Sequence, residues 1–223
     1  MLYYLDESTK LEEIGAFFQI KSMSDGYDYN ASNSIFAMDR LSNNEIPVFE
    51  PNLNSFVLKP KAKLTDVISA GYASGKGFLL NDKVKLLLQR FTIDKGIYYP
   101  ATVIYKKQNL FYSFLYIASY LIKNEGLVDF QKSFFVEKKI FEIIDTKRFE
   151  NFDNMLDYGR QMNPVHEFEI GKVFLRKEVR KLDMFRIGYG DNNIIISERL
   201  KDEIEAQKIT GVKFTKVENI FIE

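Results

Sequence analysis

Residues 77–85 read GFLLNDKVK, which is the pattern of a buried strand that passes directly into a helix. The apolar start predicts the strand. Asn81 is a favoured N-cap residue, and Asp82 follows it in the first helical turn, where a negative charge meets the positive end of the helix dipole. Val84, Leu87 and Leu88 then recur at helical spacing, so we expect them to face a core.

The same pattern returns in residues 193–201, which read NIIISERLK. Ser197 takes the capping place of Asn81, and Leu200 and Ile204 are expected to point inward. Two strand-to-helix units suggest two similar halves. The likeness is short, so a true internal repeat and convergence on a good helix start both remain open.

A β-hairpin is predicted between the two units. Residues 97–105 and 110–120 are rich in β-branched and aromatic side chains, and the polar residues 106–109 join them. Pro100 cannot donate a ladder hydrogen bond, so we expect it at an edge or a bulge.

The rest of the chain adds more strands than helices. Strands are predicted at 134–136 and 140–144, a helix at 149–162, and a second hairpin over 166–179 that turns at Gly171-Lys172. Because hairpins outnumber crossovers, the sequence predicts an α+β fold with a largely antiparallel sheet and a few helices.

Turn-forming residues cluster in the first sixty positions, and no Pro/Ser-rich linker divides the chain. We therefore expect residues 1–60 to be a loop-rich segment packed on an α+β domain over 61–223, the whole forming one compact unit.

Composition excludes several functions. The 31 basic and 31 acidic residues cancel, which argues against a general nucleic-acid binder, and the absence of cysteine excludes disulfides, thiolate metal sites and cysteine nucleophiles. The chain starts without a secretory signal pattern, so we expect a cytoplasmic protein. The longest apolar run, 110–122, would span about 20 Å as a helix against about 30 Å of hydrocarbon, so no membrane contact is expected.

No motif identifies an active site. His166 is the single histidine, and no metal-ligand or triad partner stands at a recognisable spacing from it. The glycines of 71–77 and of 188–192 fit neither a phosphate loop nor a dinucleotide fingerprint. We therefore expect no catalytic residue, cofactor or metal. The alternative is an enzyme that uses His166 with a carboxylate such as Glu167 or Glu169.

Several segments of the chain resemble a bacterial immunity-protein family that is encoded beside polymorphic toxins and was first catalogued as a domain of unknown function. The resemblance covers about residues 60–215, and Asn81 departs from it where a serine would match better. The segments that carry it, besides 77–91 and the aromatic hairpin, are 63–68, 128–133, 184–187, 194–201 and 209–214.

The resemblance implies a protein that binds and neutralises a cognate protein toxin without catalysis, and it carries no set of functional residues to transfer. Such binding needs a rigid scaffold with aromatic anchors and a polar rim. A third reading is a homo-oligomeric structural protein, and a homodimer is the other partnership to consider. The loop aromatics and acids that we predict to bind a partner are Tyr27, Asp28, Tyr29, Tyr189 and Asp191.

Overall fold

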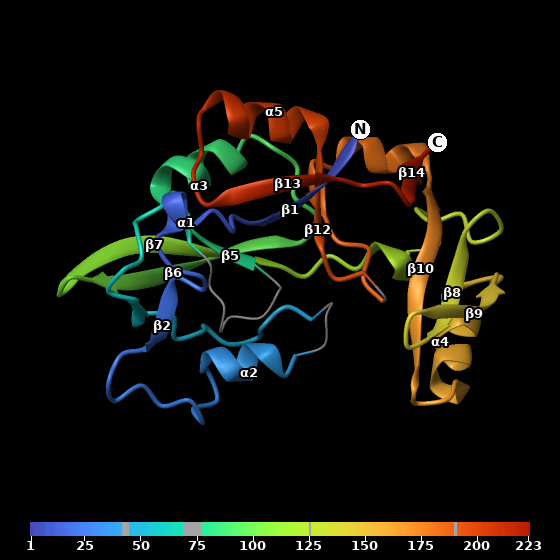
Figure 1. Ribbon diagram of the computed structural model, residues 1–223, viewed down its shortest axis with the longest axis horizontal. Coiled ribbons are helices and arrows are strands. Elements are labelled where there is room, and N and C mark those ends of the chain that lie inside the picture. Colours follow the sequence, from blue (N-terminus) through green and yellow to red (C-terminus); the bar gives the residue numbers. More distant parts are fainter. Residues whose placement is uncertain (42–44, 69–76, 125, 190) are drawn as a thin grey trace.

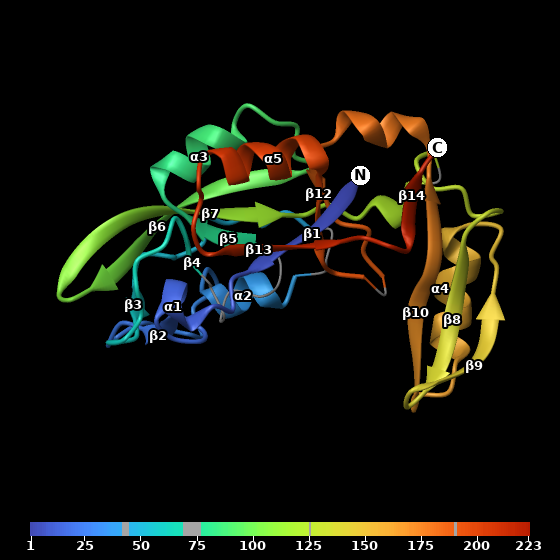
Figure 2. The ribbon, with the colours of Figure 1, turned by 45° about the horizontal axis from the view of Figure 1, so that its top comes forward.

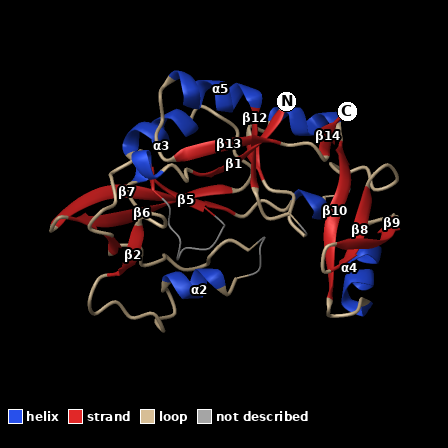
Figure 3. Cartoon of the chain, in the orientation of Figure 1, coloured by secondary structure: helices blue, strands red, loops and turns tan. Residues whose placement is uncertain are grey.

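The computed structural model describes residues 1–41, 45–68, 77–124, 126–189 and 191–223. Three sheets and a few short helices make up the fold, and most strand pairs are antiparallel (Figures 1 and 3). This confirms the predicted α+β class. Most of the glycine cluster at 71–77 lies outside the described residues.

The largest sheet has six strands and is built around the predicted aromatic hairpin, which is confirmed. The hairpin's two-residue turn is Lys106-Lys107, both with positive φ. Pro100 lies outside the part of its strand that pairs with β3, so its missing N–H disturbs no ladder. The strands, in sheet order, are β2 (Ile20–Met23), β3 (Phe56–Leu58), β6 (Gly96–Tyr105), β7 (Gln108–Ile117), β5 (Gly77–Leu80) and β4 (Val67–Ile68).

A second sheet joins the two ends of the chain. Its strands, in order, are β11 (Met184–Phe185), β12 (Ile194–Ser197), β1 (Leu2–Glu7) and β13 (Val212–Lys216). β1 lies between β12 and β13, and β3 pairs with β6, so residues 1–60 contribute strands to sheets that are completed from beyond residue 60. The division at residue 60 stays a prediction.

The third sheet lies on the right of Figures 1 and 2 and shares a hydrophobic cluster with the second sheet. Its strands, in order, are β14 (Ile220–Ile222), β10 (His166–Leu175), β8 (Phe134–Lys139) and β9 (Glu142–Lys147). β10 and β14 run parallel, and the other two pairs are antiparallel.

The helices are short and cover the sheets. They are α1 (Leu11–Ile14), α2 (Ile35–Asp39), α3 (Asp82–Leu88), α4 (Phe152–Gln161) and α5 (Glu198–Ala206), with 3₁₀ turns η2 (Leu121–Lys123) and η3 (Lys177–Lys181). As predicted, the Asn81 and Ser197 side chains cap α3 and α5 by accepting hydrogen bonds from the amides of Val84 and Leu200.

The two strand-to-helix units meet in one core. α3 and α5 lie side by side in both views (Figures 1 and 2), and Val84, Leu87, Leu88, Leu200 and Ile204 are all buried in the same hydrophobic cluster. A second cluster fills the other face of the six-stranded sheet, and a third joins β8, β10 and α4 to β1, β11 and β12 of the second sheet.

Gly77 begins β5 because the strand comes very close to β7. A Cβ at residue 77 would lie 1.8 Å from the carbonyl oxygen of Leu115, so a side chain there would push the two strands apart. The glycine at the start of the quoted pattern is therefore a packing requirement.

The predicted second hairpin over 166–179 is wrong. Residues 166–175 form the single strand β10, and η3 follows it. Gly171 lies at a register shift within the strand, where a Cβ would be 2.5 Å from the ring of Phe134. The glycine serves close packing and a bulge, which the sequence pattern does not distinguish from a turn.

Candidate functional site

Tyr27 and Tyr29 lie together in the loop between β2 and α2. Their rings meet edge to face at 5.0 Å, and the ring of Phe36 lies 5.0 Å from that of Tyr29. The Tyr27 hydroxyl donates to the carbonyl of Asn52 at 2.9 Å and accepts from the amide of Ile35 at 2.8 Å. We call Tyr27, Tyr29 and Phe36 the aromatic loop cluster.

Asp28 is exposed at the edge of this cluster. Its carboxylate accepts a hydrogen bond from the amide of Asn30 at 2.8 Å, which fixes the turn. Both tyrosine rings pack against the buried cluster of the six-stranded sheet, and this packing fixes the position of the loop. Aromatic rings are enriched at protein-binding surfaces, where a polar rim surrounds them.

Tyr189 and Asp191 lie elsewhere, in the loop between β11 and β12. Asp191 is only 7 % exposed, and its carboxylate accepts from the Tyr4 hydroxyl at 2.8 Å. The Tyr189 ring packs on those of Phe152 and Phe168. Among the described residues, no hydrogen bond or ring contact joins this pair to the aromatic loop cluster. Their role in partner binding stays a prediction.

A buried arginine that sequence reasoning missed supports this loop. Arg186 donates through Nε to the carbonyl of Asn192 at 3.0 Å and through Nη1 to the carbonyl of Ile117 at 3.3 Å. Burial lowers the pKa of its guanidinium. Because a buried cation needs acceptors, Arg186 ties the end of β7 to the β11–β12 loop.

His166 pairs with Glu137, which the sequence did not single out. Its Nδ1 donates to Oε1 of Glu137 at 2.5 Å, and the Tyr158 hydroxyl donates to Oε2 of the same carboxylate. These residues come from β10, β8 and α4. The predicted strand at 134–136 stopped one residue short of Glu137, so no sequence signal placed it opposite the start of β10.

Of the described residues, Glu167 and Glu169 are the acids that lie near His166 in the sequence, and neither forms a hydrogen bond to its ring. Glu169 forms an ion pair with Lys138 at 2.5 Å, and Glu167 is exposed. The hydrogen bonds from Tyr158 and His166 lower the pKa of the Glu137 carboxyl. In the described part of the chain, no hydroxyl bonds to the His166 ring. The cluster orients an imidazole and fastens α4 to the sheet.

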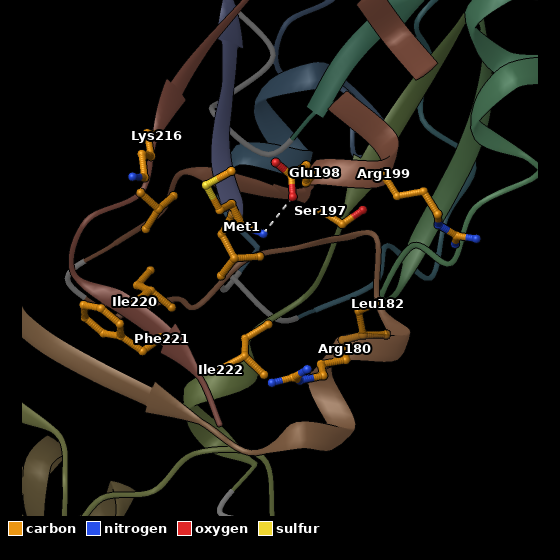
Figure 4. Close-up of a pocket in the computed structure, with 12 residues that line it drawn as sticks. Met1, Arg180, Leu182, Ser197, Glu198, Arg199, Lys216, Ile220, Phe221 and Ile222 are labelled. Carbon is orange, nitrogen blue, oxygen red and sulfur yellow. Dashed lines mark hydrogen bonds and ion pairs between the residues drawn. The ribbon is translucent and has the colours of Figure 1, made fainter. Parts of the chain in front are cut away.

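A surface cavity of about 500 Å³ opens where β1, α5, η3 and β14 meet (Figure 4). Its charged lining is largely paired within the chain: the amino group of Met1 contacts Glu198 at 3.3 Å, and Arg199 points away from the cavity toward Asp183, which it contacts at 2.5 Å. Arg180 donates through Nε to the carbonyl of Glu223 at 3.1 Å. Apolar side chains fill much of the remaining wall.

Across the residues that the structure describes, no group of three His, Asp or Glu side chains is placed to hold a metal ion. No helix within the same ranges has both the length and the apolar character needed to cross a bilayer.

Comparison with known protein families places much of the chain in one of them. A family model described as "Immunity protein family (Imm11)" matches residues 78–219, close to two thirds of the chain. The match runs from β5 to just before β14, and so contains α3, the aromatic hairpin, the third sheet's long strands and α5. The aromatic loop cluster lies before it. No curated protein matches the chain.

Proposed function

The chain belongs to the Imm11 immunity-protein family, and from this premise we propose that it binds a cognate protein toxin in the cytoplasm and neutralises it by covering a surface that the toxin needs. The family match is the observation that carries the proposal. In this function the protein catalyses no reaction, so its shape, rigidity and surface chemistry determine how well it binds the toxin.

The binding surface that we propose is the aromatic loop cluster with Asp28. Phe36 keeps part of its ring exposed while it contacts Tyr29, and the tyrosine hydroxyls are anchored to backbone groups. Rigid aromatic rings lose little entropy when a partner covers them, and a neighbouring carboxylate adds electrostatic selectivity at the rim.

The test is co-expression with the toxin polypeptide that is encoded next to this chain, read as growth rescue and as capture of the toxin by the purified protein. We expect rescue and capture together. Asp28→Lys should weaken capture about tenfold or more, whereas Glu150→Lys, the same charge change at an exposed acid on the third-sheet side, should not.

His166 separates this function from the enzymatic alternative. His166→Gln keeps a donor for Glu137, and His166→Ala removes it; we expect both variants to rescue growth in proportion to their measured affinity for the toxin. Rescue that disappears in both variants while the toxin is still captured would favour an enzyme. Absence of both capture and rescue would refute the proposal.

A further inference from the structure

β9 forms an edge of the third sheet. It pairs with β8 on one side, and no other described strand pairs with its outer side. Residues 142–146 are exposed, and only Lys147 is half-buried. An edge strand presents unpaired backbone N–H and C=O groups, which another strand can use.

Large apolar side chains gather on and beside this edge. Phe141, in the β8–β9 turn, is 93 % exposed, and Ile143 on β9 is 60 % exposed. Ile140, in the same turn, is 69 % exposed, and Ile144 on β9 is 46 % exposed. Large apolar side chains exposed at an unpaired strand edge indicate a surface that a partner covers. We define the β9 patch as Ile140, Phe141, Ile143 and Ile144.

The pairing of β9 with β8 contains a bulge. Glu137 pairs with Asp145 and Lys138 with Ile143, so Ile144 has no partner in β8. The bulge interrupts the regular ladder at Ile144 and increases the local twist of the strand.

The charges of β9 favour a second copy of the chain as that partner. When β9 is set antiparallel to itself with Glu142 opposite Lys147, the same pair forms at both ends, and Ile143 faces Thr146. If the second strand slides by one residue so that Ile143 faces Lys147, Asp145 lies opposite Asp145 of the other copy. If it slides by two residues in the opposite direction, Glu142 lies opposite Asp145. Of these registers, only the first pairs the end charges, and like every antiparallel pairing of a strand with its own copy it has the two-fold symmetry of a closed dimer.

We propose that two copies of this chain associate through antiparallel pairing of β9 with β9, in the register that places Glu142 opposite Lys147 of the second copy. The two four-stranded sheets then form one continuous sheet across the two-fold axis, in which the outer backbone groups of β9 are paired. Lys147 contacts Asp145 of its own strand at 2.5 Å, so its ammonium group lies between two carboxylates in the dimer.

The first test measures the mass of the full chain by sedimentation over about a hundredfold range of concentration. We expect a monomer–dimer equilibrium. Ile143→Lys should raise the dissociation constant at least about tenfold, because a second copy would bury the added charge. Leu86→Lys is the matched control: Leu86 is 64 % exposed on α3, away from β9, and this variant should dimerise like the unmodified chain.

The second test uses charge reversal and mixing. Glu142→Lys alone and Lys147→Glu alone should each weaken self-association by several-fold, because like charges then face each other at both ends. A mixture of the two variants should restore the dimer, since both opposite-charge pairs form again in the heterodimer. A misfolded variant could not be restored by mixing.

Three outcomes would overturn the proposal. The chain could stay monomeric at every concentration, the dimer could respond to Leu86→Lys and ignore Ile143→Lys, or the mixed variants could fail to associate. Because sedimentation uses no toxin, none of these results depends on whether the proposed immunity function is correct.

Discussion

The two hairpins β6–β7 and β8–β9 use similar residues in opposite surroundings. β6 and β7 are ten residues long, pair without a register shift, and have β3 and β5 as outer neighbours. β8 and β9 are six residues long, contain a bulge, and leave β9 at an edge. Both turns use residues with positive φ, Lys107 in the first and Ile140 in the second.

The neighbours, and not the residue types, decide which hairpin is buried. Residues 112–117 of β7 are all buried, because the sheet continues on both sides and side chains from α3 and the N-terminal loops cover its faces. Ile143 and Ile144 are equally apolar, yet they remain exposed because no described element covers β9. The first hairpin therefore supplies stability, and the second is free to supply association.

The largest expected difference between the hairpins is in core stability. Phe114→Ala in β7 should lower the free energy of unfolding by about 3–5 kcal/mol, because Phe114 is fully buried. Ile143→Ala in β9 should change it by less than about 0.5 kcal/mol. Urea denaturation at a concentration where the chain is monomeric measures both. Equal losses would show that β9 is covered in the monomer.

Helix caps give a second comparison, because an asparagine caps both α3, beside the six-stranded sheet, and α4, beside the third sheet. Asn81 accepts from the amide of Val84 and donates to Asp66, whereas for Asn151 the hydrogen bond seen among the described residues is the one it accepts from the amide of Asn154. Asn81→Ala should cost about 1–2 kcal/mol and Asn151→Ala about 0.5–1 kcal/mol. Asn81→Ser, which keeps the cap, should recover most of the loss. The reverse order would mean that the third sheet depends more on its helix.

Removing the backbone strain at Lys107, in the turn of the first hairpin, should stabilise the protein slightly. Lys107 has φ of 66°, a left-handed conformation that costs a residue with a Cβ. Lys107→Gly removes that cost but adds chain entropy to the unfolded state, so we expect a net gain of about 0.5 kcal/mol. Thermal unfolding measures it. Lys139→Gly, at the end of β8, is the control and should destabilise.

Acid should loosen the third sheet locally through Glu137. The hydrogen bonds from Tyr158 and His166 lower the pKa of this carboxyl below its ordinary value of 4.5. Because the folded pKa is the lower one, the stabilisation is present above about pH 4.5 and is lost as the pH falls through the folded pKa. The rate of amide hydrogen exchange in α4, corrected for its intrinsic pH dependence, should increase as the pH falls below the folded pKa of Glu137. Glu137→Gln should remove the transition, and an unchanged transition would exclude Glu137 as its cause.

Local signals in the sequence predicted much of the fold. The caps at Asn81 and Ser197, the inward Val84 and Leu200, and the aromatic hairpin are confirmed, because capping and apolar periodicity act within a few residues. The predicted turn at Gly171 is wrong, because the need for that glycine comes from Phe134, which lies far away in the sequence.

The candidate site was less accessible to such reasoning. The sequence showed aromatics and an acid at Tyr27, Asp28 and Tyr29, but not that Phe36 joins them, because that contact depends on how α2 packs. Glu137 was missed for the same reason: its partners His166 and Tyr158 arrive from β10 and α4.

By itself the sequence determined the α+β class, the strand-to-helix units, and the family resemblance that the family match supports. Only the tertiary structure decided which apolar strands are covered and which one forms an edge. The physical reason is that capping and periodicity are set by neighbouring residues, whereas burial depends on what the rest of the chain places against each strand.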